Sequence, residues 1–401
     1  MIHAGSGLAV SATPDDAALE ASLAAIQASG TDRADLALVF ASGAEAGDRA
    51  HAVLHAVRRA TGARAVVGCT GVGVLTERRE VEGDTAAAVL TVARDGLVVT
   101  PFLLPDLETI GADAGSRLAV ATAETVLESG SVILLPDARG LDPWALLTRF
   151  DAAMGYVPIV GAVAAGPALV EFCNTDVTQG GVAGLALSGE EPVIGVAQGC
   201  MPIGEPYVIT AAEGTVIHSI GSRRALVVLK EAIETLPNPN ERIQRAGLFA
   251  GLAIDPAKSP LERGDFLVRH LVAIDQSSGA IAVGDQVRVG QTIQFQIRDA
   301  EAARDDLAAM LAGVVRRLDG RRPAFGCYFN CAGRGEGLYG KPDHDVTMIR
   351  ERLGPVPLAG FFGNGEFAPI ARRNLFHTYT GVLVIFPDGG PDMAPMPPDA
   401  R

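Results

Sequence analysis

The chain has 401 residues, 48% of them hydrophobic and 20% charged, which is enough apolar sequence for two or three compact units with sizeable cores. Its 33 basic and 47 acidic residues leave a formal net charge of −14, and this charge argues against nucleic acid as a partner. The N-terminus lacks a charged segment followed by an apolar core, and no apolar run is long enough to span a bilayer. We therefore expect a cytoplasmic protein without membrane insertion.

The first part of the chain contains a pattern that then returns twice. Residues 35–42 (DLALVFAS) predict a buried strand, 48–62 a helix, 63–75 (ARAVVGCTGVGVL) a strand with a glycine-rich end, and 85–93 a return strand. The second copy covers residues 131–140, 142–155, 157–166 and 180–189, and the third covers 323–335, 343–354, 356–369 and 377–386. Each predicted helix begins near an aspartate (Asp48, Asp142 or Asp343) and ends at a glycine, as capped helices do.

Between the second and third copies the pattern changes. Residues 208–222 and 266–299 predict antiparallel strands separated by glycine turns, 235–266 a long connection, and 300–320 an amphipathic helix. The expected fold class is α/β and α+β, with repeated strand-loop-helix-strand units in two mixed-sheet domains. The expected divisions are a helical lead-in at 1–30, domains at 31–220 and 221–388, and a disordered, proline-rich tail at 389–401.

The five cysteines are too scattered for a disulfide framework, and Cys327 and Cys331 lie four residues apart on a predicted strand. Because four residues of a strand span about 13 Å, these two thiols cannot share one metal ion. The glycine-rich loop that follows has Pro342 where a phosphate-binding loop needs serine or threonine, which excludes that motif. No metal site is expected.

The third copy is the one whose loops carry charge. Arg334 and Lys341 suit contact with an anion, Glu366 suits contact with an ammonium group, and the backbone between them is rich in donors. The expected ligand-binding residues are Asn330, Cys331, Arg334, Tyr339, Lys341, Asn364 and Glu366, and no catalytic residue is assigned.

Residues 326–370 and 375–386 resemble the C-terminal half of the FIST family, the F-box and intracellular signal transduction sensory domain. Residues 63–75, 85–93 and 158–166 resemble its N-terminal half, so that 31–220 and 221–388 would be FIST N-like and FIST C-like domains. This resemblance implies a sensory module for small-ligand binding, with an amino acid or derivative as the ligand. It also implies signal transduction through a separate signalling protein.

Two alternatives stay open at this point. Some proteins that resemble this family are haem-based nitric oxide sensors, for which His344 or His377 would supply an axial ligand, although no cofactor is expected from the residues themselves. Cys331 could also serve as the nucleophile of a hydrolase or transferase if a base lay beside it.

Overall fold

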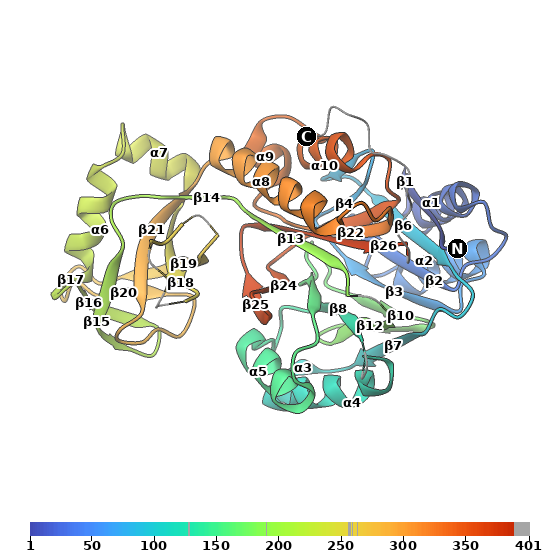
Figure 1. Cartoon of the computed structure of the whole chain (residues 1–401), viewed down its shortest axis with the longest axis horizontal. Coiled ribbons are helices and arrows are strands. Elements are labelled where there is room, and N and C mark those ends of the chain that lie inside the picture. The colour runs from blue at the N-terminus through green and yellow to red at the C-terminus, as the bar shows by residue number, and fades with distance from the viewer. Residues whose placement is uncertain (127–128, 190, 256–257, 259, 263, 389–401) are drawn as a thin grey trace. The chain divides into compact units, whose positions relative to one another are not determined.

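The computed structural model describes residues 1–126, 129–189, 191–255, 258, 260–262 and 264–388 (Figure 1). The predicted tail at 389–401 lies outside these residues. Two compact units form, the larger from Met1–Val196, Ala308–Phe376 and the chain from Thr380, and the smaller from Ala197–Leu307 with His377–Tyr379. The expected division near residue 220 is therefore not where the chain separates in space, because the third copy belongs to the same unit as the first two.

The chain runs through one order of elements three times: strand, helix, strand, helix, strand, hairpin and return strand. The first copy comprises β1 (His3–Val10), α1 (Pro14–Ser29), β2 (Leu36–Ser42), α2 (Ala50–Thr61), β3 (Ala65–Thr70), β4 (Gly73–Thr76), β5 (Glu80–Glu82) and β6 (Ala86–Ala93). The N-terminal segment is thus a strand and a helix of the first copy, whereas the sequence predicted only a helical lead-in.

The second and third copies keep this order, each with small additions. The second comprises β7 (Val99–Leu104), the short α3 (Leu107–Ile110) and η1 (Gly111–Asp113), α4 (Ala114–Val126), β8 (Gly130–Pro136), α5 (Pro143–Met154), β9 (Ile159–Ala162), β10 (Glu171–Cys173), β11 (Asp176–Thr178) and β12 (Val182–Ser188). The third comprises β13 (Val193–Gln198), α8 (Ala300–Leu318), β22 (Pro323–Cys331), α9 (Gly335–Tyr339), α10 (His344–Leu353), β23 (Leu358–Gly363), β24 (Glu366–Ile370), β25 (Arg373–His377) and β26 (Thr380–Pro387).

The smaller unit is inserted between the first strand and the first helix of the third copy. It comprises β14 (Cys200–Pro202), β15 (Tyr207–Glu213), β16 (Val216–Ile220), β17 (Arg223–Arg224), α6 (Ala225–Glu234), α7 (Pro239–Ala246), β18 (Leu248–Ala253), β19 (Phe266–Ile274), β20 (Ile281–Val283) and β21 (Thr292–Arg298). All its described strand pairs are antiparallel, which confirms the prediction for this stretch.

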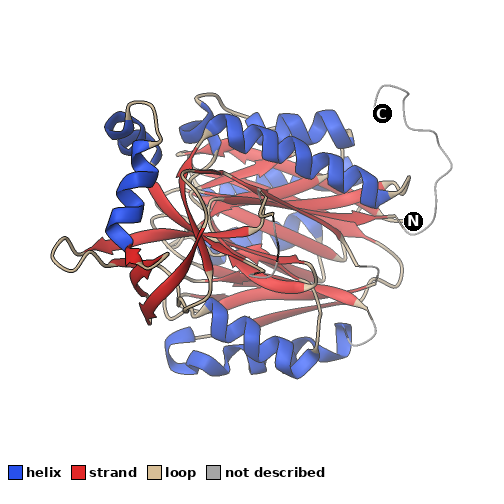
Figure 2. Cartoon of the chain, turned by 60° about the vertical axis from the view of Figure 1, so that its left-hand side comes forward, coloured by secondary structure: helices blue, strands red, loops and turns tan. Residues whose placement is uncertain are grey.

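The larger unit contains three six-stranded sheets, ordered β1-β6-β2-β3-β10-β11, β25-β24-β9-β8-β12-β7 and β13-β26-β22-β23-β4-β5. Each sheet is built on one parallel pair, β2–β3, β8–β9 or β22–β23. The hairpins are exchanged in a cycle: β4–β5 joins the sheet of the third copy, β10–β11 that of the first and β24–β25 that of the second. Helices lie on the outer faces of these sheets (Figure 2).

One glycine in each parallel pair shows that the three copies share a register. A Cβ atom on Gly68, Gly161 or Gly360 would lie 1.7, 2.0 or 1.7 Å from a carbonyl oxygen of the neighbouring strand. No side chain fits there, so the close approach of the two strands requires glycine at these positions. The inner faces of the sheets form one apolar core, in which Phe40 stacks on Phe361 at a centroid distance of 4.9 Å.

Candidate functional site

Asp345, in the first turn of α10, is the centre of a buried polar network at the end of β22. Its Oδ2 accepts hydrogen bonds from the Tyr328 hydroxyl (2.8 Å), from Asn330 Nδ2 (3.3 Å) and from Nε and Nη2 of Arg334 (3.2 and 3.1 Å). Its Oδ1 lies 2.9 Å from Nδ1 of His344. Strand and helix thus meet through one carboxylate that has partners on both oxygens.

The network keeps two opposite charges away from water. Arg334 is 1% exposed and Asp345 is fully buried. Burial by itself raises the pKa of the Asp345 carboxyl, but the Arg334 charge and the hydrogen bonds from His344 and Tyr328 hold that pKa well below its usual range. Asp345 is therefore ionised at neutral pH and balances the guanidinium.

Tyr339, at the end of α9, closes the network on one side. Its hydroxyl accepts a 2.6 Å hydrogen bond from Arg334 Nη2, and its ring stacks on the His344 ring at a centroid distance of 3.6 Å. Burial raises the pKa of the Tyr339 hydroxyl, which stays protonated. One face of the His344 imidazole is thus covered by Tyr339, while its Nδ1 is engaged by Asp345.

Glu366 begins β24 and is fully buried. Its Oε2 accepts the Thr380 N–H at 3.3 Å, whereas its Oε1 makes no hydrogen bond of ordinary geometry in the described part of the chain. Burial raises the pKa of Glu366 well above its usual range, although the Thr380 N–H, the Cys331 thiol and the Arg334 charge act in the opposite direction. Glu366 is a buried carboxyl with an unused oxygen beside a buried arginine.

Acidic residues of the first copy's hairpin also reach this region, which the sequence did not indicate. Glu80 Oε1 accepts the Val346 N–H at 3.1 Å, and Glu82 Oε1 accepts the Glu336 N–H at 2.8 Å. Burial and the Asp345 charge raise the pKa of Glu80 to about 8. Only the exchange of hairpins brings residues 80–82 to the third copy, so no local pattern could have predicted these contacts.

Asp343 does not cap α10 as the sequence predicted. It precedes the helix with a positive φ of 57°, and its side chain makes no capping hydrogen bond. Its Oδ1 instead accepts the Glu80 N–H at 2.6 Å. The aspartate ties the exchanged hairpin to the helix start, whereas Asp142 caps α5 as expected by accepting the Ala145 N–H.

The seven residues expected to bind the ligand fall into two groups. Asn330, Cys331, Arg334 and Glu366 are buried and Tyr339 is half-buried, and all five take part in the contacts described above or adjoin them. The side chains of Lys341 and Asn364 are exposed and make no hydrogen bond or ion pair among the described residues. The sequence assigned no role in the site to Tyr328 or Asp345, although both lie in the segment that it singled out.

The end of β8 in the second copy is a second, equivalent site. The carboxylate of buried Asp137 accepts hydrogen bonds from Arg139 Nε (3.1 Å) and from the Gly180 N–H (2.8 Å). Glu171 pairs with Cys69, which follows Gly68, just as Glu366 pairs with Ala162, which follows Gly161. Burial, followed by the Asp137 charge, raises the pKa of Glu171 to about 9. Two of the three copies therefore place a protonated carboxyl at one structural position.

The other candidate groups lie as follows. All five cysteines are buried, and burial raises the pKa of Cys327 to about 12. His377 is buried at the end of β25. No group of three or more histidine, cysteine, aspartate or glutamate side chains in the described residues is arranged to hold a metal ion. Among these residues no helix has the length and apolar character to cross a bilayer.

Models of two protein families match consecutive parts of the chain, FIST N domain at residues 35–223 and FIST C domain at residues 225–369. The chain belongs to the FIST family. Its FIST N and FIST C domains are sensory domains of signal transduction, thought to bind small ligands. The family boundary near residue 224 follows the sequence, whereas the compact units divide elsewhere because the hairpins are exchanged.

Similar proteins extend over almost the whole chain. Uncharacterized proteins of Mycobacterium tuberculosis (strain CDC 1551) and Mycobacterium bovis are 34% and 36% identical over 389 and 392 residues. The matches cover 95% of this chain in both cases, and 99% and 98% of the relatives. A crystal structure of cyanuric acid hydrolase from A. caulinodans aligns over 97% of this chain and 100% of its own, with 13% identity and a TM-score of 0.35. That score is too low to establish a common fold.

Proposed function

We propose that this FIST protein senses a small ligand that carries an ammonium group, an amino acid or a derivative, at the end of β22. The observation that carries the proposal is the Oε1 atom of Glu366, a buried carboxyl oxygen without a hydrogen-bond partner in the described residues. Buried polar atoms in native proteins are nearly always paired, so an unpaired one beside a charged network is a candidate ligand contact.

The ligand's ammonium group would bind Glu366, and its carboxylate would meet the arginine of the network. Arg334 carries the positive charge of the network, which would attract the ligand's carboxylate although Arg334 also pairs with Asp345. Asn330 and Cys331, at the end of the same strand, would line the inner part of the site. Exposed Lys341 and Asn364 would contact the outer part of the ligand, and the signal would pass to a separate protein.

The test is a thermal-shift screen of the purified protein against amino acids and their simple derivatives. A ligand at 100 times its Kd should stabilise the protein by about 2.7 kcal/mol. Glu366→Gln keeps the shape of the side chain but cannot lose a proton to become a carboxylate, and it should abolish the shift. The control is Glu124→Gln, which makes the same change at an exposed position of α4 and should leave the shift intact. A screen without any shift, or one that Glu366→Gln leaves unaltered, would contradict the proposal.

A further inference from the structure

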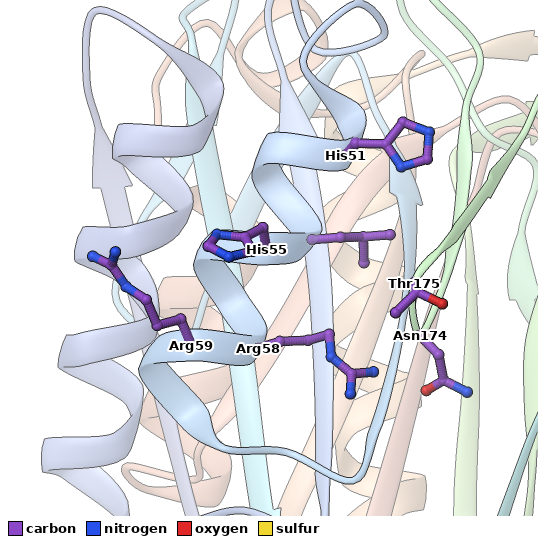
Figure 3. A pocket seen from close by; sticks show the side chains of 7 residues that line it. His51, His55, Arg58, Arg59, Asn174 and Thr175 are labelled. Carbon is purple, nitrogen blue, oxygen red and sulfur yellow. The ribbon is translucent and has the colours of Figure 1, made fainter.

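A pocket of about 470 Å³ lies on the outside of the larger unit, far along the chain from the β22 site. Helix α2 and the turn between β10 and β11 form it, and Figure 3 shows its lining, which consists of His51, Leu54, His55, Arg58, Arg59, Asn174 and Thr175. In this view His51 and Arg58 extend toward the β10–β11 turn, whereas Arg59 extends in the opposite direction. Leu54 is the apolar residue of the lining, and it is buried.

Each polar side chain that lines the pocket has a group that can donate a hydrogen bond to an anion. The Asn174 Oδ1 accepts the Val66 N–H at 3.1 Å, and this contact fixes the amide so that Nδ2 remains as a donor. Arg58 offers a guanidinium, and Thr175 offers a hydroxyl. No carboxylate lines the pocket, and neither Arg58 nor Arg59 forms an ion pair among the described residues, in a chain whose net charge is −14.

Arginines in the last turn of a helix are also expected to offset the helix dipole. The second copy shows that the dipole does not require a basic residue at this position, because its helix α5 has no basic residue in its last turn. There Asn374, from the third copy's exchanged hairpin, accepts the Ile159 N–H on Oδ1 at 2.9 Å, as Asn174 does for Val66, and its Nδ2 donates to Asp151 Oδ1 at 2.9 Å. That asparagine therefore has an acidic partner on the helix.

Asp151 and Arg58 occupy the same helical position in their copies. The N–H of Gly155 donates to the Asp151 carbonyl at the end of α5, and the N–H of Gly62 donates to the Arg58 carbonyl at the end of α2. Where the second copy closes the helix–hairpin junction with an acid, the first copy has an arginine, and a pocket is present. An anion in this pocket would take the place that the Asp151 carboxylate takes in the second copy.

We propose that this pocket binds the phosphoryl group of a small phosphomonoester. The Arg58 guanidinium would hold two phosphoryl oxygens, with His51, Asn174 Nδ2 and the Thr175 hydroxyl as further donors. Leu54 would contact the organic part. The volume is that of a pocket for a small organic molecule, and it exceeds what a free phosphate ion needs.

The experiment is isothermal titration calorimetry of the full chain in a phosphate-free buffer, with inorganic phosphate and phenyl phosphate as separate probes. We expect phenyl phosphate to bind more tightly than inorganic phosphate because only the former has an organic part. Arg58→Asp, which installs the residue of the second copy, should weaken binding by at least about tenfold. Arg117→Asp makes the same charge change at an exposed position of α4, outside the pocket, and should weaken it by less than about threefold.

Two further measurements keep the outcome interpretable. Arg58→Gln should give the same loss without a new negative charge, and the thermal midpoint of each variant reports whether it is folded. Glu366→Gln should leave phosphate binding unchanged, so this site and the β22 site can fail separately. Absence of heat with both probes, or an equal loss in Arg58→Asp and Arg117→Asp, would overturn the proposal. Equal affinity for the two probes would show that the pocket recognises the phosphate group alone, and it would exclude a phosphomonoester as the preferred ligand.

Discussion

The ends of β22 and β8 occupy equivalent places in two copies of one backbone pattern, yet their chemistry differs. In the third copy, Arg334 is 1% exposed and its charge is balanced by Asp345 from a helix that begins ten residues later. In the second copy, Arg139 pairs with Asp137 two residues away and its side chain is 48% exposed. The repeated backbone fixes where a strand ends, whereas the loop and helix that follow decide whether a buried charged network forms there.

The two equivalent glutamates sharpen this comparison. Burial raises the pKa of both carboxyl groups, and the charge of an arginine in the same copy offsets only part of this increase. Glu366 has the Thr380 N–H as a defined partner for Oε2, whereas neither oxygen of Glu171 makes a hydrogen bond of ordinary geometry in the described residues. In the first copy the same position is occupied by Val74, which pairs with Phe361. One position thus carries a valine or a buried carboxyl without loss of the fold.

The largest expected effect comes from removing the centre of the network. Asp345→Ala leaves the Arg334 charge and three polar groups without their shared acceptor, and it should lower the free energy of unfolding by about 3–5 kcal/mol. Chemical denaturation measures this loss. Asp137→Ala in the second copy should cost less, about 1–3 kcal/mol, because the half-exposed Arg139 can turn to water. Equal losses would show that the two strand ends are energetically alike.

The next effect concerns the pH dependence of stability. The pKa of Glu171 is raised from 4.5 to about 9 on folding, so the stability that its protonated form contributes is complete below pH 4.5. That contribution is lost as the pH rises toward 9. Glu171→Gln cannot ionise and should therefore be more stable than the parent by up to about 3 kcal/mol at pH 7, with a difference that vanishes near pH 4.5.

Urea denaturation between pH 4.5 and pH 8.5 measures this difference. Glu124→Gln makes the same substitution at an exposed position of α4 and serves as the control, for which we expect the parent's pH dependence. If Glu171→Gln had the slope of the parent, Glu171 would be ionised in the folded protein.

A third effect, the pH dependence of ligand affinity, tests the proposed contact between Glu366 and the ligand. Because the pKa of Glu366 is raised by burial, binding of an ammonium group requires this carboxyl to lose its proton. Affinity for such a ligand should rise with pH by up to about tenfold per pH unit below the pKa of Glu366 in the ligand-free protein. Calorimetry in buffers of different ionisation enthalpy would detect the released proton, and an affinity independent of pH would exclude an ionised Glu366 at the ammonium.

The smallest effect is expected at the exposed end of the charged segment. Lys341→Ala should change the free energy of unfolding by no more than about 0.5 kcal/mol, because its side chain has no partner among the described residues. It should weaken ligand binding only modestly, since an exposed charge acts through water and salt. A large loss of stability would mean that Lys341 is part of the network, in contrast to its exposed position.

Local sequence patterns determined the repeated part of this fold. The buried strand of each copy, the helix that follows and the glycine-rich strand after it could all be recognised, because apolar periodicity and helix-ending glycines are local signals. The antiparallel character of residues 208–222 and 266–299 followed from their turns in the same way. The concentration of ionisable residues in the third copy was also visible, and with it Arg334 and Glu366.

Tertiary structure decided what these residues contact. Exchange of the hairpins places Glu80 beside α10 and Glu82 beside α9. It also brings Asn174 opposite Arg58. In each case more than a hundred residues of sequence separate the two groups. Pairing between distant strands depends on how the whole core packs, and the hydrophobic pattern of either strand does not indicate its partner. The sequence alone determined the elements and their repetition, whereas the packing of three sheets decided which acids meet which arginines.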